Sequence, residues 1–433
     1  MIDFAKYKQV TEKTPFLYKG RVTKVVGMAI ESIGPISNIG DICEVVTKDR
    51  GKNLLAEVVG FRDRNILLMP LGDIEGIGPG CEVLATGQKI SVKVDESLLG
   101  KVVDWQGNPL DGEIMNCKFD APIENTAPNP LSRERIETQL VLGVKAIDGM
   151  LSLGKGQRMG IFAGSGVGKS TLMGMIARNA LSDINVIALI GERGREVREF
   201  IEKDLKLEGL KRSIVVVATS DQPALIRLKS AKSATAMAEY FRSQGKDVLL
   251  LMDSLTRFSM AQREIGLSIG EPPISRGYTP SVFAVMPKLL ERAGNDDKGS
   301  ITGLYTVLVD GDDFNEPITD TARGILDGHI MLSRKIAHKA HYPAIDVLAS
   351  ISRVMGDITS PEHRKWAMEI KKYMAIYHEA EDLINVGAYN KGSNPEIDKA
   401  IVKMEAINKF LTQQTSDNIS IDETLKLMKE IGG

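Results

Sequence analysis

Apolar residues divide the chain into regions with different periodicities. Residues 18–95 hold short apolar runs separated by Gly, Pro and Asp, a pattern that predicts β-strands closing into a small barrel. In residues 96–359, longer apolar runs alternate with segments of helical spacing, and residues 360–433 have helical spacing alone. We therefore expect an N-terminal tail at 1–17, then a β-barrel domain, an α/β domain and a C-terminal helical domain.

The α/β region should form a mostly parallel sheet, because its continuous apolar runs suit strands that are buried on both faces. Ligands of such sheets bind at the carboxyl ends of the strands. Residues 99–112 have the pattern of a hairpin at the start of this region. The predicted barrel strands are 21–26, 42–46, 54–59 and 65–69. The predicted strands of the sheet are 159–163, 186–190, 214–218, 248–252, 304–309 and 347–351, with helices at 170–180, 197–203, 233–242 and 318–323.

Capping residues mark three helix starts in the C-terminal region. Ser360 and Asn394 each precede a Pro, and Ser420 lies three residues before Glu423. Both patterns are typical of a helix N-terminus. The N-terminal tail has one short apolar face, which predicts either a partner-binding helix or a frayed terminus. That face consists of Ile2, Phe4, Tyr7 and Val10.

The predicted strand at 159–163 leads directly into a glycine-rich loop and a helix. The loop and the start of the helix comprise Gly164, Ser165, Gly166, Val167, Gly168, Lys169, Ser170 and Thr171. In such a loop, backbone N–H groups surround phosphate oxygens, the lysine reaches the β- and γ-phosphates, and the serine hydroxyl joins the Mg²⁺ shell. Ala163 stands where the usual pattern has a Gly, but alanine suits the end of a strand. We predict a nucleoside triphosphate site, against the alternative of a chance glycine-rich turn.

Composition narrows the class of protein. The 433 residues, 43% hydrophobic and 26% charged, are typical of a globular protein with two or three domains. The 55 Lys and Arg against 57 Asp and Glu predict no attraction to nucleic acid. Cys43, Cys81 and Cys117 are isolated, which argues against a disulfide framework or a zinc site and fits a reducing cytoplasm. Without a signal peptide or a membrane-spanning apolar run, we expect a soluble intracellular protein.

Hydrolysis of a triphosphate also needs a carboxylate for the metal shell and a group that orients water. Asp253 ends the apolar run 248–252, so we predict that it lies beside Lys169 as a metal-shell ligand rather than as a helix cap. Glu192 follows the run 186–190. From the residues alone, Glu192 is equally a base that polarises water or a solvated turn residue.

Several further motifs resemble those of a known family. Motifs that follow the order of the rotary-ATPase catalytic subunits lie at 163–170, 191–193, 253–257, 342–346 and 350–353. Motifs that are more narrowly similar to the type III protein-export ATPases, flagellar branch, lie at 160–170, 218–223, 260–265 and 305–313. The similarity runs from about residue 18 to residue 389, and the flagellar branch shares the alanine at position 163.

The resemblance implies a RecA-like P-loop NTPase core and an ATPase that uses ATP and Mg²⁺. It implies that Lys169 and Ser170 contact the phosphates and Mg²⁺, that Asp253 belongs to the metal shell, and that Glu192 is the catalytic carboxylate. The remaining glycine-rich loop residues would hold the phosphates.

Three other roles follow from the resemblance alone. It makes Tyr342 an adenine-stacking residue and Arg353 an arginine finger, and it puts Arg193 in a supporting network. Without the resemblance, Tyr342 would be taken for a core aromatic residue and Arg353 for a surface arginine.

The resemblance also implies partners. Because Glu192 and Arg353 stand in one chain, identical subunits could complete one another's sites, and we expect a homo-hexamer. Regulator and central-stalk proteins, export chaperone–substrate complexes and a membrane export gate are the other implied partners. The chain would be cytoplasmic and peripheral at the inner membrane. The Pro- and Gly-rich segment 270–280 would face the stalk, unless it is an ordinary surface loop.

The predicted function is ATP hydrolysis for the flagellar type III export apparatus, supporting the docking, unfolding and export of substrates. An injectisome ATPase is the nearest alternative, because it shares the catalytic motifs; residues 27–43 look more flagellar. A rotary ion-translocating subunit is disfavoured because residues 377–383 lack the acidic run of synthase catalytic subunits. A nucleic-acid translocase is disfavoured by the near-neutral charge and by the lack of an aromatic, basic strand face in 18–94.

Overall fold

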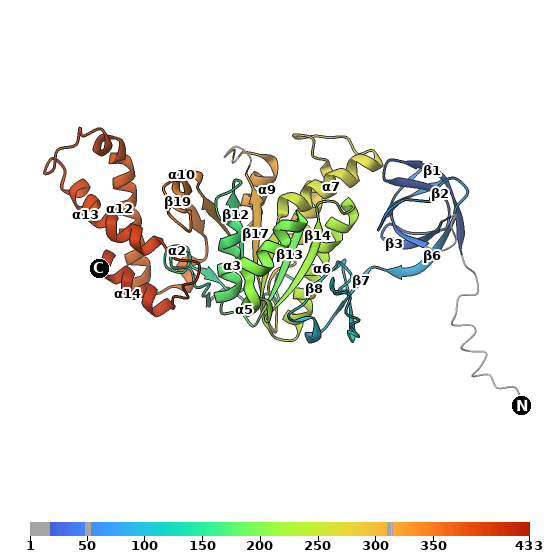
Figure 1. Cartoon of the computed structure of the whole chain (residues 1–433), viewed down its shortest axis with the longest axis horizontal. Coiled ribbons are helices and arrows are strands. Elements are labelled where there is room, and N and C mark those ends of the chain that lie inside the picture. The colour runs from blue at the N-terminus through green and yellow to red at the C-terminus, as the bar shows by residue number, and fades with distance from the viewer. Residues whose placement is uncertain (1–17, 48–52, 310–312, 314) are drawn as a thin grey trace, which may run out of the picture.

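The computed structural model describes residues 18–47, 53–309, 313 and 315–433. The β-barrel lies at one end, the central sheet with its helices in the middle, and the C-terminal helices at the other end (Figure 1). The helix predicted for residues 2–10 falls outside the described residues. Among the helices of the described ranges, none combines the length and the apolar character needed to cross a membrane.

The barrel predicted from the short apolar runs is confirmed. In the described residues it closes in the order β1-β2-β5-β4-β3-β6, and its interior holds inward-facing residues such as Val22, Ile30, Cys43 and Val58. Each of the four predicted strands lies within an observed one, whereas β2 and β6 were not predicted. The bounds are β1 Lys19–Val26, β2 Ala29–Ile33, β3 Asp41–Val46, β4 Asn53–Arg62, β5 Asn65–Pro70 and β6 Glu82–Lys89.

The central sheet has the order β19-β18-β12-β17-β15-β13-β14-β8 in the described chain. Along this order the pairings from β18 to β8 are parallel, and β19 runs antiparallel to β18. The bounds are β8 Val102–Val103, β12 Arg158–Ala163, β13 Ile184–Glu192, β14 Ser213–Thr219, β15 Asp247–Asp253, β17 Ser300–Leu308, β18 Gly328–Leu332 and β19 Ile345–Ser352. Short pairs are formed by β7 Ser91–Val94 with β9 Phe119–Pro122, by β10 Gln139–Leu140 with β11 Leu153–Gly154, and by β16 Gly294–Asn295 with β17.

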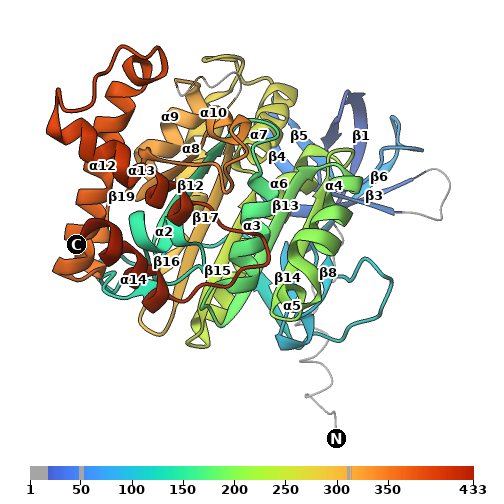
Figure 2. The same ribbon diagram turned by 60° about the vertical axis from the view of Figure 1, so that its left-hand side comes forward.

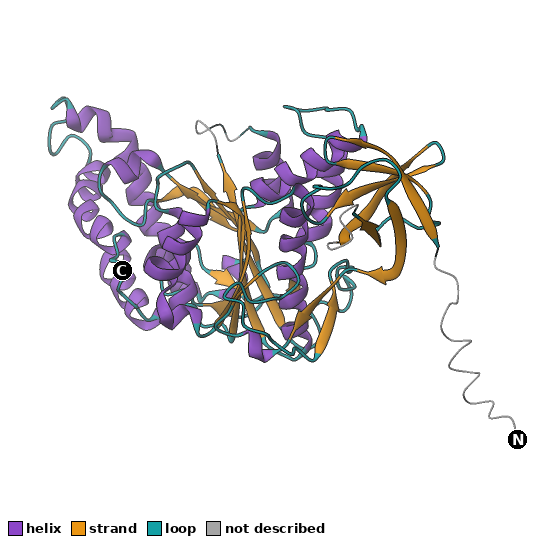
Figure 3. Ribbon diagram, turned by 45° about the vertical axis from the view of Figure 1, so that its right-hand side comes forward, coloured by secondary structure: helices purple, strands orange, loops and turns teal. Residues whose placement is uncertain are grey.

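Helices cover both faces of this sheet, as the continuous apolar strands predicted (Figure 3). Side chains alternate between two cores: Phe162 packs on the side of α6 to α9, while Ile161 packs on the side of α2 and α3. The bounds are α2 Lys145–Met150, α3 Lys169–Asn179, α4 Gly194–Glu199, α5 Lys206–Leu210, α6 Ala224–Ser243, α7 Leu255–Ile269, α8 Pro280–Leu290, α9 Pro317–Ile325, α10 Arg334–His338 and α11 Met355–Ile358.

Three local predictions differ from the structure. Residues 99–112 are not a regular hairpin: Val102 and Val103 pair in parallel with β14, and between the two arms there is one isolated bridge, Val103–Pro109, rather than a ladder. The predicted helix 197–203 is split between α4 and a π-helical segment, η2 Phe200–Leu205, which packs closely against α3. The helix predicted at 233–242 begins earlier, at Ala224, and α7 and α8 were not predicted at all.

The three capped C-terminal helices are confirmed as α12 Pro361–Asn385, α13 Pro395–Leu411 and α14 Ile421–Gly432. Ser360, Asn394 and Ser420 each accept a hydrogen bond from a backbone N–H in the first turn. These helices lie beside α2 (Figure 2), where a Cβ on Gly149 would come within 3.0 Å of both Met428 and Phe410. Glycine therefore allows the close contact between the two domains.

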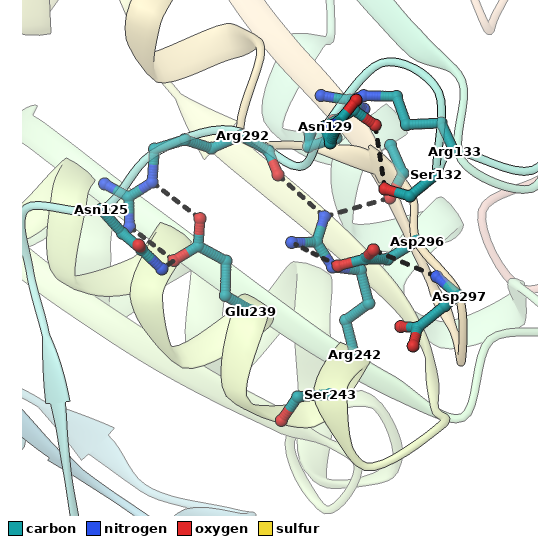
Figure 4. Close-up of polar contacts among 12 residues, drawn as sticks. Asn125, Asn129, Ser132, Arg133, Glu239, Arg242, Ser243, Arg292, Asp296 and Asp297 are labelled. Carbon is teal, nitrogen blue, oxygen red and sulfur yellow. Dashed lines mark hydrogen bonds and ion pairs between the residues drawn. The ribbon is translucent and has the colours of Figure 1, made fainter.

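Two buried arginines, Arg242 and Arg292, form hydrogen bonds that connect α6, the turn after α8 and the segment between the barrel and the sheet (Figure 4). Arg292 donates to both carboxylate oxygens of Glu239 on α6, at 2.8 and 2.7 Å, and to the carbonyl of Ile123 at 2.8 Å. Arg242 donates to the carbonyls of Arg292 and Gly294. The turn after α8 is thus tied to α6 and to the connecting segment.

Replacing Arg292 with Met should destabilise the chain by about 3–5 kcal/mol, because Glu239 would remain buried without its partner charge. The urea midpoint of unfolding measures this loss. The double variant Arg292→Met/Glu239→Leu should recover most of it, because no unpaired charge then remains. Lys372→Met, whose partner Glu396 is 64% exposed, is the matched control and should cost less than about 0.5 kcal/mol. A midpoint unchanged by Arg292→Met would contradict this account.

Candidate active site

The glycine-rich loop connects β12 to α3 at the carboxyl edge of the sheet. Gly166 and Gly168 have φ values of +77° and +90°, which side chains other than glycine rarely adopt. Val167 is buried in the core and anchors the loop, while Lys169 begins the helix. The positive end of α3 therefore faces the inside of the loop, as phosphate binding requires.

The structure brings Lys169 and Asp253 into direct contact. Nζ of Lys169 lies 2.5 Å from Oδ1 of Asp253. Since β17 lies between β12 and β15, these two strands are about 10 Å apart, and the side chains of Lys169, at the start of α3, and Asp253, at the end of β15, meet across β17. The hydroxyl of Thr306 on β17 donates to the same Oδ1 at 2.7 Å and fixes the orientation of the carboxylate.

Glu192 is the third member of this cluster, at the end of β13. Its Oε1 lies 3.8 Å from Nζ of Lys169. Burial and the nearby charge of Asp253 raise the pKa of Glu192 to about 7, although Lys169 opposes the shift. The preceding residue, Gly191, has a φ of +72° and would place a Cβ 3.1 Å from the side chain of Arg257. Arg257 thus packs on the backbone that carries Glu192.

A cavity of about 550 Å³ adjoins the phosphate loop. The ring of Tyr342 borders it and lies 3.6 Å from the position that a Cβ on Gly168 would occupy. The other lining residues are Gly166, Thr171, Leu172, Met175, Ala340, Pro343 and the segment Thr412, Gln413, Gln414 and Thr415. With 45% of Tyr342 exposed, its ring is available for stacking on a base.

Arg353 does not join this cluster. It follows β19, and its backbone N–H donates to the carbonyl of Asp327. The backbone N–H of Asp327 in turn donates to the carbonyl of Arg158, the first residue of β12. The length of β12 therefore separates Arg353 from the phosphate loop, roughly 17 Å at 3.3 Å per residue. Arg193 is not part of the cluster either: its side chain is 80% exposed, and its Nη1 lies 3.5 Å from Oε1 of Glu196.

Two residues of the site were missed by sequence reasoning. Thr306 is a polar residue within an apolar strand, and its hydroxyl is buried. A polar residue at such a position could have been predicted to bond to a group of the site. Nothing in the sequence around Gln413 indicates a place in the site. Its backbone N–H donates to the carbonyl of Tyr342 at 3.0 Å, and its side chain forms hydrogen bonds with the backbone of Gly143 and Lys145. It connects the C-terminal helices to the cavity.

No group of three His, Cys, Asp or Glu side chains that could hold a metal ion by itself occurs in the described ranges. The residues nevertheless fit Mg²⁺ bound together with a nucleotide. Such a site usually takes one or two protein oxygens, phosphate oxygens and water. Asp253 offers a carboxylate that is 4% exposed, and Ser170 offers an exposed hydroxyl in the first turn of α3.

Comparisons with known proteins show the family of this chain. Residues 143–352 match the ATP synthase alpha/beta family, nucleotide-binding domain, and residues 22–87 match the beta-barrel domain of the same family. Residues 359–430 match the T3SS EscN ATPase C-terminal domain. The chain is 56% identical to the flagellum-specific ATP synthase of Bacillus subtilis over 96% of this chain and 95% of that protein. This chain belongs to the type III export ATPase family.

Other relatives of this type III export ATPase come from both branches of the family. The flagellum-specific ATP synthase of Treponema pallidum is 50% identical, over 98% of this chain and 95% of its own. The type 3 secretion system ATPase of Xanthomonas euvesicatoria is also 50% identical, over 95% and 93%. The solved structure of the assembled ATPase EscN from the enteropathogenic E. coli type III secretion system is 44% identical, with a TM-score of 0.90, over 96% of this chain and all of EscN. The predicted family and fold are confirmed.

Replacing Glu192 with Gln should change stability in a pH-dependent way. Between pH 4.5 and 7, the folded chain keeps the Glu192 proton while the unfolded chain releases it, so the unsubstituted ATPase loses stability as pH rises through this window. Glu192→Gln should therefore be more stable above pH 7, by about 2 kcal/mol after allowance for screening, and the difference should shrink toward pH 4.5.

Urea midpoints measured from pH 4.5 to 8 test this expectation. Glu405→Gln replaces an exposed glutamate on α13 and should show no such pH-dependent gain. Equal stability of Glu192→Gln and the unsubstituted chain at every pH would contradict the raised pKa.

Proposed function

We propose that the chain hydrolyses ATP in the flagellar type III export apparatus, supporting the docking, unfolding and export of substrates. The observation that carries the hydrolytic part is the cluster of Lys169, Asp253 and Glu192 beside the phosphate loop. The flagellar assignment rests on full-length similarity to flagellum-specific relatives at 56% and 50% identity. The injectisome relatives, also near 50%, supply the second candidate.

The proposed roles follow from the chemistry of each group. Residues 164–171 hold the phosphates through backbone N–H groups, and Lys169 exchanges its contact with Asp253 for the β- and γ-phosphates. Glu192, with a pKa of about 7, accepts a proton from the attacking water near neutral pH. Asp253 and Ser170 would hold Mg²⁺, which supplies charge stabilisation to the phosphates when bound. Tyr342 stacks on adenine, and Arg193 supports Glu192 through Glu196.

Arg353 can complete such a site only from a neighbouring subunit, because its own phosphate loop lies at the opposite edge of the sheet. The structure of EscN is described as assembled, and a second one contains its central stalk EscO, over 96% of this chain at a TM-score of 0.87. We infer a homo-hexamer in which each Arg353 stabilises transition-state charge at the next subunit. A stalk protein near segment 270–280, a regulator, chaperone–substrate complexes and a peripheral position at the membrane export gate complete the proposal.

Mixing two inactive variants tests the shared site. Arg353→Ala subunits retain Glu192, and Glu192→Gln subunits retain Arg353, so a random ring should regain about one quarter of the unsubstituted ATPase activity. ATP turnover in the mixture measures the recovery. Lys169→Ala mixed with Glu192→Gln should recover nothing, because Lys169 and Glu192 must come from one chain. If the first mixture stays as inactive as its components, Arg353 does not act between subunits.

Deleting the gene tests the biological assignment. In the organism that encodes the chain, loss of the protein should abolish flagellar filaments and swimming, and the unsubstituted gene should restore both. Lys169→Ala should fail to restore them fully, because the phosphates lose their cation. Normal flagella together with loss of needle-type secretion would favour the injectisome ATPase instead.

A further inference from the structure

The cavity beside the phosphate loop has one polar wall, formed by residues 412–415. Most of the remaining lining is apolar or aromatic, including Leu172, Met175 and Tyr342. An aromatic ring stacks on any base, because every base has a π-face. Stacking on Tyr342 therefore does not distinguish one base from another. Discrimination between bases must come from hydrogen bonds to the polar wall.

Most of the polar groups in that wall are already engaged. The Gln413 amide donates to the carbonyl of Gly143 at 2.8 Å, and its oxygen accepts from the backbone N–H of Lys145 at 2.9 Å. The Thr412 hydroxyl donates to the carbonyl of Asn408 at 2.8 Å. Thr415 contributes an exposed hydroxyl, and its carbonyl already accepts from Arg178 at 2.6 Å.

Gln414 differs from its neighbours. Gln414 is exposed, and its backbone N–H donates to the side-chain carboxylate of Asp417 at 3.0 Å. Its side-chain amide has no hydrogen bond within the described part of the chain. The Thr415 hydroxyl also has no hydrogen bond in the described residues, but Gln414 has the longer side chain and carries its donor and its acceptor on two separate atoms.

We propose that Gln414 contacts the substituent at position 6 of a purine base, and that the site therefore accepts guanine as well as adenine nucleotides. This inference rests on the proposed function, because it takes the cavity beside Lys169 as the base site. Adenine carries an amino donor at position 6, and guanine carries a carbonyl acceptor. A carboxamide can turn its oxygen to the first or its nitrogen to the second, so the wall discriminates only weakly between the two bases.

Substitutions that leave residue 414 with hydrogen-bond acceptors alone, or with donors alone, test this assignment. Gln414→Glu offers only acceptors and should raise the ratio of kcat/KM for ATP over GTP by about tenfold. Gln414→Lys offers only donors and should lower the same ratio by about tenfold. Dissociation constants for both nucleotides, measured on the full chain, should move in parallel. The unsubstituted chain should prefer ATP by no more than about tenfold.

Matched controls separate base recognition from a change of charge. Gln244→Glu and Gln244→Lys make the same replacements at an exposed glutamine after α6 and should leave the ratio unchanged. An unchanged ratio in both Gln414 variants, or shifts of the reversed sign, would overturn the assignment even with ATP hydrolysis intact. Failure of the unsubstituted chain to turn over any nucleotide would instead overturn the proposed function, while the dissociation constants would still decide the role of Gln414.

Discussion

The contact between the Lys169 ammonium and two carboxylates, the buried Asp253 and the partly buried Glu192, is the constraint on which the candidate active site depends. Asp253 and Glu192 repel each other at close range, and the lysine between them keeps both within one cluster. The order of the strands creates this arrangement, since a single strand, β17, lies between β12, which leads into the phosphate loop, and β15, which ends in Asp253. The same geometry raises the pKa of Glu192 toward neutrality, which suits its proposed role as the group that accepts a proton from water.

The direction of β19 imposes a second constraint. A parallel strand would end beside the phosphate loop, but β19 runs antiparallel to β18 and delivers Arg353 to the opposite edge of the sheet. A cation that is proposed to stabilise the transition state therefore has to act on another subunit. The chain contains all the proposed catalytic groups, yet in one copy Arg353 lies at the edge of the sheet opposite the phosphate loop.

The segment that follows α13 lines the cavity proposed to bind the nucleotide base. Gln413 joins the backbone of Tyr342 to that of Gly143, and residues 412–415 form one wall of the cavity. Tight packing at Gly149 fixes these helices against α2. A movement of this domain would therefore change the shape of the proposed base pocket, which provides a physical link between nucleotide binding and whatever contacts the C-terminal helices.

Local patterns in the sequence determined much of this protein. The glycine-rich loop, the apolar strands ending in Asp253 and Glu192, and the capping residues Ser360, Asn394 and Ser420 depend on neighbours within a few residues, so they could be predicted. Only the tertiary structure decided which distant residues meet: Thr306 with Asp253, Gln413 with Tyr342, and Val102 with the edge of β14. Strand order and strand direction determine these contacts, and neither leaves a periodicity in the sequence. Arg353 was singled out by the family resemblance alone, and the direction of β19 decided that it lies far from its own phosphate loop.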